Sequence, residues 1–314
     1  MKARAIIVVM KIIIAGYGVE GISNLVYFQQ KFPDAEFVVA DERPADKLPT
    51  IPDGRGPAAG FSAGREVFMN AARRTDGRNS RSAPRTGIVV ASRSGSFRLP
   101  GKALLPLRGQ PMLLFLLRRI RAIRRADAVL LATTTLPADD ALADLARQAD
   151  VPVVRGPVDD VVARYVLAAE KAGLDYVVRV TADCPFLDAR LLDHCLEHAW
   201  NRDFHLATTK GVFPVGLDCE IYPAALMARL HSEGRLDAAE REHLTLRFYN
   251  RPEDYEILRI PAPRAWQSSA VLTVDTGEDY ARAARLAEEL PSAEADTETV
   301  LRAYARLFGE EDAH

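Results

Sequence analysis

Cysteine is scarce in this sequence, long apolar runs are missing, and neither sign of charge is in clear excess. The three cysteines, Cys184, Cys195 and Cys219, are too few and too widely spaced for a disulfide framework or a cysteine-rich zinc site. A reducing compartment, the cytoplasm, is therefore expected. Lysine and arginine number 41 and aspartate and glutamate 43, so the net charge of −2 gives no global reason to expect a nucleic-acid partner. Any charged ligand must be recognised locally.

The missing apolar runs bear on membranes. The opening residues, MKARAIIVVMKIIIAG, place a basic start before an apolar stretch, but Lys11 interrupts that stretch. It falls well short of the roughly 20 apolar residues that cross a bilayer. We interpret it as a buried strand and predict no membrane insertion.

The rest of the composition is that of an ordinary globular protein. With 314 residues, 48% of them hydrophobic, the chain is long enough for about two domains. Residues 49–86 are rich in glycine, proline and arginine and leave little apolar surface to bury, so we interpret them as a flexible linker. This divides the chain into a short segment, 1–48, a main domain, 87–290, and a C-terminal helix with an acidic tail, 291–314.

Strand-like and helix-like patterns alternate along the main domain. Apolar runs at 88–90, 128–132, 151–154 and 176–180 alternate with amphipathic patterns at 111–123, 139–149, 159–171 and 188–200, and shorter strand candidates follow at 219–222, 256–260 and 271–274. Such alternation predicts an α/β fold, a three-layer Rossmann-like arrangement with helices on both faces of a mostly parallel, mixed sheet. Residues 1–48 show one partial Rossmann-like βαβ unit, with strands at 11–15 and 37–40 and a helix at 19–31.

A first glycine-rich turn lies in this N-terminal unit. Gly16, Gly18 and Gly21 follow a strand, and Asp41 ends the next strand about 20 residues later, which is the dinucleotide-binding pattern. Residues 10–44 also resemble the start of UDP-N-acetylmuramoylalanine–D-glutamate ligase, whose first domain is Rossmann-like and binds the uridine nucleotide. No ATP-binding G-x-x-x-x-G-K-[ST] motif follows. The segment is either a nucleotide site or a truncated, structural or fused remnant.

A second glycine-containing loop, residues 92–102, carries more chemistry. Its small residues allow backbone N–H groups to converge on phosphate oxygens; they are Ser92, Ser94, Gly95 and Ser96. Arg93, Arg98 and Lys102 add three cations at the end of a predicted strand, where open α/β sheets bind ligands. We interpret the loop as a triphosphate site, the alternative being a basic surface loop.

Two acidic residues also follow predicted strands. Asp183 comes after the strand at 176–180, and Asp275 after the one at 271–274. Mg²⁺ is held by one or two carboxylates together with phosphate oxygens and water, so both residues are candidates for a metal site that faces the phosphate loop. Each could instead be a helix N-cap or a turn residue. Asp139 and Asp140, which follow Pro137, are interpreted as N-cap residues without a chemical role.

These features occur together in one family. The loop SGSFRLPGK resembles the signature loop of sugar nucleotidyltransferases, in particular the cytidylyltransferases of the spore coat polysaccharide biosynthesis type, which are related to 3-deoxy-manno-octulosonate and sialic acid cytidylyltransferases. Later segments agree with this family in order across residues 86–290; they are LPADDALADLA, VPVVRGPVDDVVARY, VVRVTADCPFLD, GLDCEIY, EREHLT and LTVDTGEDY. The resemblance implies a nucleotide-diphospho-sugar transferase fold for residues 87–290 and a homodimer.

The resemblance also implies an activity. A Mg²⁺-dependent cytidylyltransferase would transfer CMP from CTP to an acidic sugar of the ulosonic or nonulosonic type, with release of pyrophosphate, for surface polysaccharide synthesis. The alternatives are transfer to a sugar phosphate, giving an NDP-sugar, and a degenerate fusion that binds nucleotide without turnover. The chain has Ala91-Ser92-Arg93 where the family usually has Gln-Ala-Arg, and Phe97 where it has threonine. Nucleotidyl transfer is therefore predicted more firmly than the choice of CTP.

The matched motifs assign the site residues. The predicted metal ligands are Asp183 and Asp275, the catalytic triphosphate ligands are Arg93 and Lys102, the further nucleotide contacts are Ser92, Ser94, Gly95, Ser96, Arg98, Arg164 and Asp183, and the acceptor contacts are Asp218, Glu220, Arg241 and His243. A guanidinium can clamp a carboxylate with two bonds, which suits an acidic acceptor. His243 could equally be a hydrogen-bonded core histidine.

Overall fold

The computed structural model describes residues 11–15, 36–40 and 84–309. The chain divides into two units, Met1–Asn79 and Ser80–His314. In the first unit, β1 (Lys11–Ala15) and β2 (Glu36–Ala40) pair in parallel, so both predicted strands are confirmed. The helix at 19–31, the turn of Gly16, Gly18 and Gly21, Asp41, the linker as far as residue 83 and the acidic tail lie outside the described residues.

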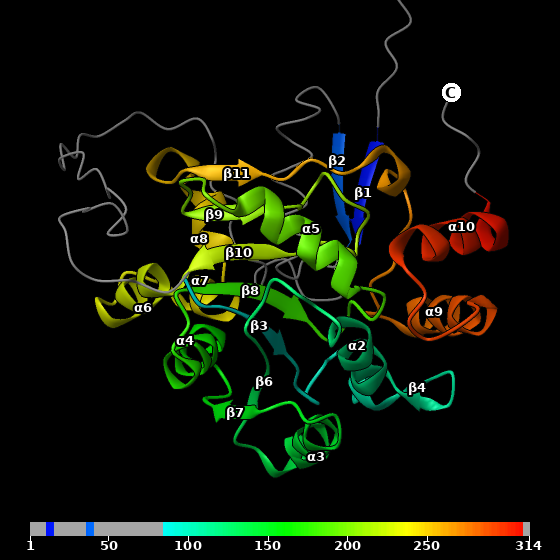
Figure 1. The fold of residues 1–314 in the computed structure, drawn as a ribbon, viewed down its shortest axis with the longest axis horizontal. Coiled ribbons are helices and arrows are strands. Elements are labelled where there is room, and N and C mark those ends of the chain that lie inside the picture. Colours follow the sequence, from blue (N-terminus) through cyan, green and yellow to red (C-terminus); the bar gives the residue numbers. More distant parts are fainter. Residues whose placement is uncertain (1–10, 16–35, 41–83, 310–314) are drawn as a thin grey trace, which may run out of the picture. The chain divides into compact units, whose positions relative to one another are not determined.

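The second unit is built on a seven-stranded sheet (Figure 1). Its strands, in spatial order, are β11 (Ile257–Arg259), β9 (Leu206–Thr208), β10 (Glu220–Pro223), β8 (Tyr176–Thr181), β3 (Thr86–Ala91), β6 (Ala128–Thr134) and β7 (Val153–Gly156). Within this sheet β10 is antiparallel to both of its neighbours, and every other pairing is parallel. The sheet is therefore mostly parallel and mixed, as predicted.

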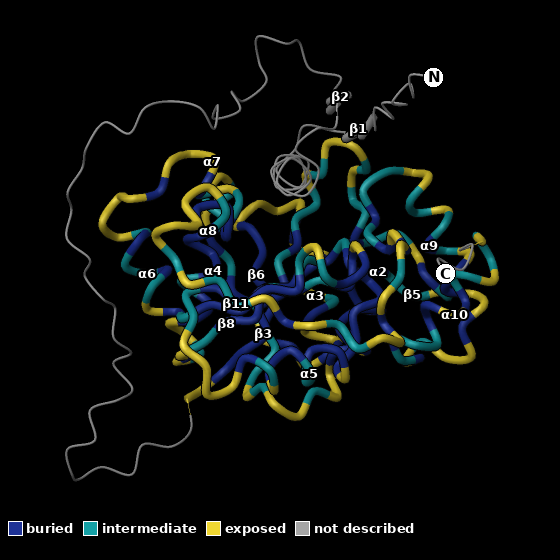
Figure 2. Tube along the Cα trace, turned by 90° about the horizontal axis from the view of Figure 1, so that it is seen from above, coloured by how far each residue is buried: buried dark blue, intermediate teal, exposed yellow. Residues whose placement is uncertain are grey.

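Central strands of this sheet are buried on both faces. Val89 and Val177 contribute to one hydrophobic cluster, whereas Ile88, Val90 and Val178 contribute to the other. Successive side chains of a strand point to opposite faces, so an unbroken apolar run serves both clusters at once. Figure 2 shows these strands in dark blue, with helices on either side.

Helices cover both faces of the sheet and complete the three layers. One cluster contains apolar side chains of α2 (Met112–Ile120), α3 (Asp140–Gln148), α5 (Ala189–Ala199), α9 (Gly277–Glu289) and α10 (Thr297–Phe308). The other contains those of α4 (Val161–Ala172), α6 (Ala224–Ser232) and α8 (Leu246–Asn250), with the short α7 (Ala238–Glu242) beside α4 and α8. The fold class predicted from the alternating pattern is confirmed. Among the described helices, none is long and apolar enough to cross a membrane.

The predicted strand at 271–274 is wrong. This segment makes only an isolated bridge, between Val271 and Val215, and its other backbone bonds go to loops and to side chains of helices rather than to the sheet. The N–H of Leu272 donates to the carbonyl of Val215 at 2.7 Å, and that of Val274 donates to the carbonyl of Asp183 at 2.8 Å. The apolar run therefore reflects burial in a loop connection and not membership of the sheet. Three-residue β9 was not predicted, because so short a strand shows no periodicity.

Candidate active site

The carboxyl ends of the parallel strands meet at one edge of the sheet. The 92–102 loop follows β3 at this edge, residues 135–139 follow β6, residues 157–160 follow β7, and Asp183 follows β8. Because β10 runs the other way, its first residue, Glu220, lies at the same edge, opposite Arg179 of β8. Ligands of open α/β sheets bind at this edge.

The 92–102 loop is closed at its base by its own backbone. The carbonyl of Ser94 accepts the N–H groups of Ser96 at 2.9 Å and of Gly101 at 3.0 Å. Gly101 makes this closure possible, since its φ of 68° lies in the left-handed region that favours glycine. The predicted phosphate loop is therefore a defined turn, and Lys102 stands at its end, where a short 3-10 helix begins.

The carboxylate of Asp139 is hydrogen-bonded to the backbone of this loop. Its Oδ1 accepts the N–H of Ser94 at 2.7 Å, and its Oδ2 accepts both the N–H and the hydroxyl of Thr134 at the end of β6. Burial by itself raises the pKa of Asp139, but the hydrogen bonds from Thr134 and Ser94 outweigh it, so the pKa lies below its ordinary value. Asp139 occupies the N-cap position of α3, as predicted, but its side chain makes no cap bond to that helix and holds the loop instead. The available signal was its place after a strand, at the edge that carries the loop.

Lys102 brings together the two predicted metal ligands. Its Nζ lies 2.9 Å from Asp183 Oδ2, 2.8 Å from Asp275 Oδ1 and 3.0 Å from the carbonyl oxygen of Val274. The side chains of all three charged residues are less than 20% exposed. Burial opposes the charge of Lys102, but the two carboxylates outweigh it and raise its pKa above the ordinary value. Burial likewise opposes the charge of Asp183, and the neighbouring ammonium lowers its pKa overall.

These oxygens are a suitable donor set for a magnesium ion. Two carboxylates and a carbonyl already surround one cation, and Mg²⁺ prefers oxygen ligands, with phosphate and water completing its shell. Within the described ranges no group of three or more His, Cys, Asp or Glu side chains could hold a metal on its own. Phosphate oxygens and water would supply the remaining ligands of a metal at this point.

The loop arginines are more exposed than Lys102. Arg98 lies 3.1 Å from Asp275 Oδ1, and Arg93 lies 3.3 Å from Glu242 Oε1 of α7. Both side chains are roughly two-fifths exposed, so their guanidinium groups can be reached by a ligand above the loop. Arg164 differs because it is buried and donates from Nη1 to the carbonyls of Pro157 and Val158, at 2.5 and 3.0 Å. The structure thus places Arg164 beneath the loop that follows β7.

Glu220, one of the predicted acceptor contacts, is buried and bonded to three other side chains. Its Oε2 lies 3.0 Å from Nη1 of Arg179 and accepts the hydroxyl of Thr245 at 2.8 Å, while its Oε1 accepts the hydroxyl of Tyr249 at 2.6 Å. Burial raises the pKa of Glu220, but Lys210 and Arg179 outweigh it and lower the pKa overall. Asp218 accepts the N–H of Gly216 at 3.0 Å, and burial raises its pKa.

His243 shares this environment, whereas Arg241 does not. The pKa of His243 falls to about 3, first through burial and then through repulsion by Arg179, Arg93 and Lys210. His243 is therefore neutral at physiological pH. Nη1 of Arg241 instead lies 3.1 Å from Asp160 Oδ2. The same carboxylate oxygen lies 2.9 Å from Nε2 of His231.

Arg179 and Lys210 are site residues that the motifs did not single out. Arg179 pairs with Glu220, and Lys210 stacks over the ring of Tyr249 at 5.6 Å. Both also influence the pKa of His243. The sequence signal for Arg179 was a charge inside the apolar run of β8, which a buried strand retains only if the charge is paired.

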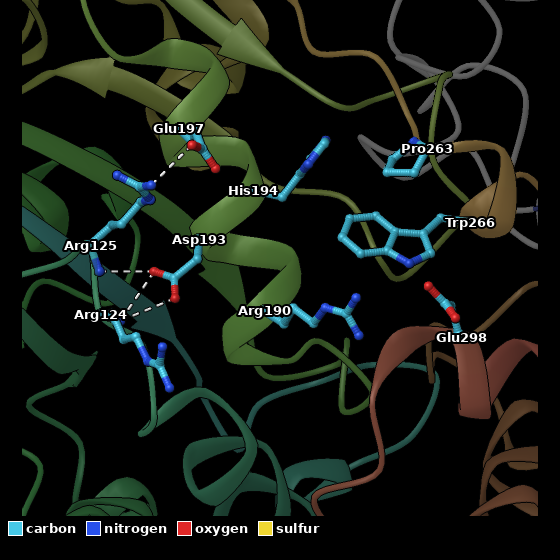
Figure 3. A pocket seen from close by; sticks show the side chains of 9 residues that line it. All are labelled: Arg124, Arg125, Arg190, Asp193, His194, Glu197, Pro263, Trp266 and Glu298. Carbon is cyan, nitrogen blue, oxygen red and sulfur yellow. Dashed lines mark hydrogen bonds and ion pairs between the residues drawn. The ribbon is translucent and has the colours of Figure 1, made fainter.

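A groove of about 590 Å³ lies elsewhere, on the outer side of α5 (Figure 3). Asp193 accepts the backbone N–H groups of Arg124 and Arg125, the guanidinium of Arg125 lies 3.0 Å from Glu197, and that of Arg190 lies 3.1 Å from Asp296. None of the predicted site residues lines it; its lining comprises Arg124, Arg125, Arg190, Asp193, His194, Glu197, Pro263, Trp266 and Glu298.

The second unit has a mostly parallel sheet covered by helices, and the carboxyl edge of this sheet carries a cationic loop and two acidic residues. This combination is typical of nucleotidyltransferases that make nucleotide-sugars. Residues 87–308 match the family model described as cytidylyltransferase, and the chain belongs to that family.

Known relatives agree with this assignment. The spore coat polysaccharide biosynthesis protein SpsF of Bacillus subtilis is 30% identical over 62% of this chain and 82% of its own length. A 3-deoxy-manno-octulosonate cytidylyltransferase of Anaeromyxobacter is 32% identical over 35% of this chain, but over only 44% of its own length.

Solved structures show the same fold. A cytidylyltransferase from Leptospira borgpetersenii, 31% identical, aligns with 71% of this chain and 95% of its own at a TM-score of 0.67. A CMP-2-keto-3-deoxy-manno-octonic acid synthetase complexed with CTP, 18% identical, aligns with 65% of this chain and 99% of its own at a TM-score of 0.50. The resemblance of residues 10–44 to the ligase gains no support from these similarities.

Proposed function

We propose that this cytidylyltransferase transfers CMP from CTP to an acidic sugar of the ulosonic or nonulosonic type, with Mg²⁺ and release of pyrophosphate, for surface polysaccharide synthesis. The observation that carries the proposal is the convergence of Lys102, Asp183 and Asp275 under the 92–102 loop. The names of the relatives in Bacillus and Anaeromyxobacter support the pathway and the acceptor class. The homodimer and the cytoplasmic location expected from the sequence stay predictions.

In this reaction an acceptor hydroxyl displaces pyrophosphate at the α-phosphorus. Negative charge on the triphosphate must be neutralised, and Lys102, Arg93 and Arg98 supply three cations around one loop. Asp183 and Asp275 would hold Mg²⁺, which when bound would neutralise phosphate charge. Asp139 keeps the loop in place by fixing the N–H of Ser94.

The acceptor would lie towards β10 and α7. Arg179 and Lys210 are cations on this side of the site, and a guanidinium binds a carboxylate well. Neutral His243 can offer a ring nitrogen to a sugar hydroxyl. A sugar phosphate would use the same cations, and the acceptor panel below separates the two classes.

Pyrophosphate release tests the proposal. Mg²⁺ and each of CTP, UTP, ATP and GTP are combined with single ulosonic acids and single sugar 1-phosphates. We expect release with CTP and an acidic sugar, and a rate at least about a hundredfold lower in Asp183→Asn, the scale of losing one electrostatic stabiliser of the transition state. Asp144→Asn, which removes an exposed carboxylate of α3, is the matched control. Release only with sugar phosphates, or only with another nucleotide, would contradict the proposal.

A further inference from the structure

Lys102 occupies the point at which the predicted metal ligands converge. Its ammonium is within 3.0 Å of Asp183 Oδ2, Asp275 Oδ1 and the Val274 carbonyl. Two largely buried carboxylates facing one another repel, and an opposite charge between them removes that repulsion. Lys102 is thus the counter-ion of the pair.

A divalent ion would need the same oxygens. Mg²⁺ binds oxygen at about 2.0–2.1 Å, so it would displace the ammonium from between the two carboxylates. Both cations at this point would repel strongly at such short range. Occupation by Lys102 and occupation by a metal therefore exclude each other.

The ammonium of Lys102 can leave the two carboxylates through rotation of its own side chain. Lys102 begins the short 3-10 helix η2 (Lys102–Leu104), directly after Gly101. Its flexible four-carbon stem allows Nζ to move while the backbone stays in place. A triphosphate bound on the 92–102 loop would offer the ammonium an alternative partner, because Lys102 belongs to that loop.

We infer that Lys102 is an internal cation that keeps divalent metal off Asp183 and Asp275 until a triphosphate on the loop draws its ammonium away. Metal binding and nucleotide binding then favour each other, and the coupling is reciprocal. The inference rests on the proposed function, which places the triphosphate at the loop and the metal at the two aspartates.

The test is Mn²⁺ binding by the full chain, followed by the loss of the electron paramagnetic resonance signal of free Mn²⁺, with and without CTP. Lys102→Met removes the ammonium, and Lys102→Gln removes the charge but keeps a donor to one carboxylate, in case methionine prevents folding. Arg98→Met is the matched control, because it removes a cation 3.1 Å from Asp275 without uncovering the pair. The double variant Asp183→Asn with Asp275→Asn reports Mn²⁺ held by CTP alone.

Without CTP, we expect wild type to bind Mn²⁺ no better than the double variant, and the Lys102 variants to bind it about tenfold more tightly or better. Arg98→Met should gain clearly less. Wild type could bind Mn²⁺ only with CTP and the two aspartates, while the Lys102 variants bind Mn²⁺ no more tightly without CTP. This result would overturn the inference about Lys102 and leave the proposed metal site standing. Equal gains in Arg98→Met would also overturn the inference. Uptake no greater than that of the double variant in every protein, with or without CTP, would overturn the metal site of the proposed function as well.

Discussion

The acidic residues at the carboxyl edge of the sheet differ in what their side chains contact. Asp183 and Asp275 face Lys102, whereas Asp279 closes a capping box with Thr276 at the start of α9. Sequence motifs predicted that the first two lie beside the phosphate loop, because each motif has a strand or turn of fixed spacing around its acid; their role as metal ligands stays a prediction. The motifs were not sufficient for Asp139, whose decisive partner, Ser94, is 45 residues away.

Replacing Asp139 should weaken nucleotide binding more than it slows the chemical step. In Asp139→Asn one oxygen becomes an NH₂ group, so either Ser94 or Thr134 faces a donor instead of an acceptor. A buried donor without an acceptor costs about 1–3 kcal/mol, so we expect a lower melting temperature and a KM for CTP about tenfold higher, with kcat changed much less. Steady-state kinetics and thermal unfolding measure both, with Asp144→Asn as the surface control. An unchanged KM would show that the loop does not depend on this carboxylate.

His243 should make the protein sensitive to acid. Its pKa is about 3 in the folded chain and about 6.5 when unfolded, so between these values the unfolded state binds more protons and stability falls as the pH falls. From pH 7 to 5 this one group should cost about 2 kcal/mol of unfolding free energy. Denaturant unfolding at both pH values should show a smaller loss in His243→Gln. The same loss in both proteins would mean that His243 takes up its proton in the folded state.

At the scale of elements, the sequence predicted what depends on local periodicity. The runs at 88–90, 128–132 and 176–180 became β3, β6 and β8, because apolar runs between turns fit strands buried on both faces. The segment 271–274 was mistaken for a strand because its hydrogen bonds go to Val215 and Asp183, which no local pattern reveals. Its end nevertheless brings Asp275 to within 2.8 Å of Lys102 Nζ, although the element that carries it was predicted wrongly; its role as a metal ligand stays a prediction.

Gly216 should therefore matter for activity at a distance from the reacting groups. Its φ is 88°, and a Cβ there would lie 2.4 Å from the nitrogen of Thr273 and 2.5 Å from the carbonyl carbon of Leu272. Gly216→Ala should push away the segment that carries Asp275, lowering both the melting temperature and kcat. Gly234→Ala is the matched control, since its φ is 65° but a Cβ there meets nothing within 4 Å. The control should lose only the roughly 1–2 kcal/mol of left-handed backbone strain and keep its kcat. Equal effects of the two substitutions would mean that strain, not displacement, matters.

At the scale of the molecule, the transferase unit begins before the residues that match the family. The family model starts at residue 87, but the carbonyl of Arg85 accepts the N–H groups of Asp175 and Tyr176, at 2.7 and 3.2 Å, and the N–H of Arg85 donates to Asp175 Oδ2 at 2.7 Å. These bonds fasten the start of β3 to the start of β8. The sequence did not reveal this, because the arginine-rich stretch around residue 85 has the composition of a linker.

Truncation at two places tests whether residues 80–86 belong to the transferase unit. A chain that starts at Ser80, the boundary between the two units, should retain the melting temperature and the kcat of the full chain. One that starts at Gly87 loses the Arg85 bonds and that of the Thr86 N–H to Asp127 Oδ2. We expect it to melt several degrees lower, since about 1 kcal/mol per lost bond is a large share of the stability of a domain. Thermal unfolding of both chains decides; equal melting temperatures would show that the fastening is dispensable.

The reversed direction of β10 has a consequence for how substrate choice can diverge. The proposed nucleotide half of the edge is made where parallel strands end, but the proposed acceptor half begins where β10 starts, after the connection 209–219, and continues in α7 and α8. That connection joins two antiparallel neighbours, so changes in its length leave the register of β3, β6 and β8 untouched. Acceptor preference can thus change through this connection, provided that Val215 and Gly216, which position the segment that carries Asp275, are kept.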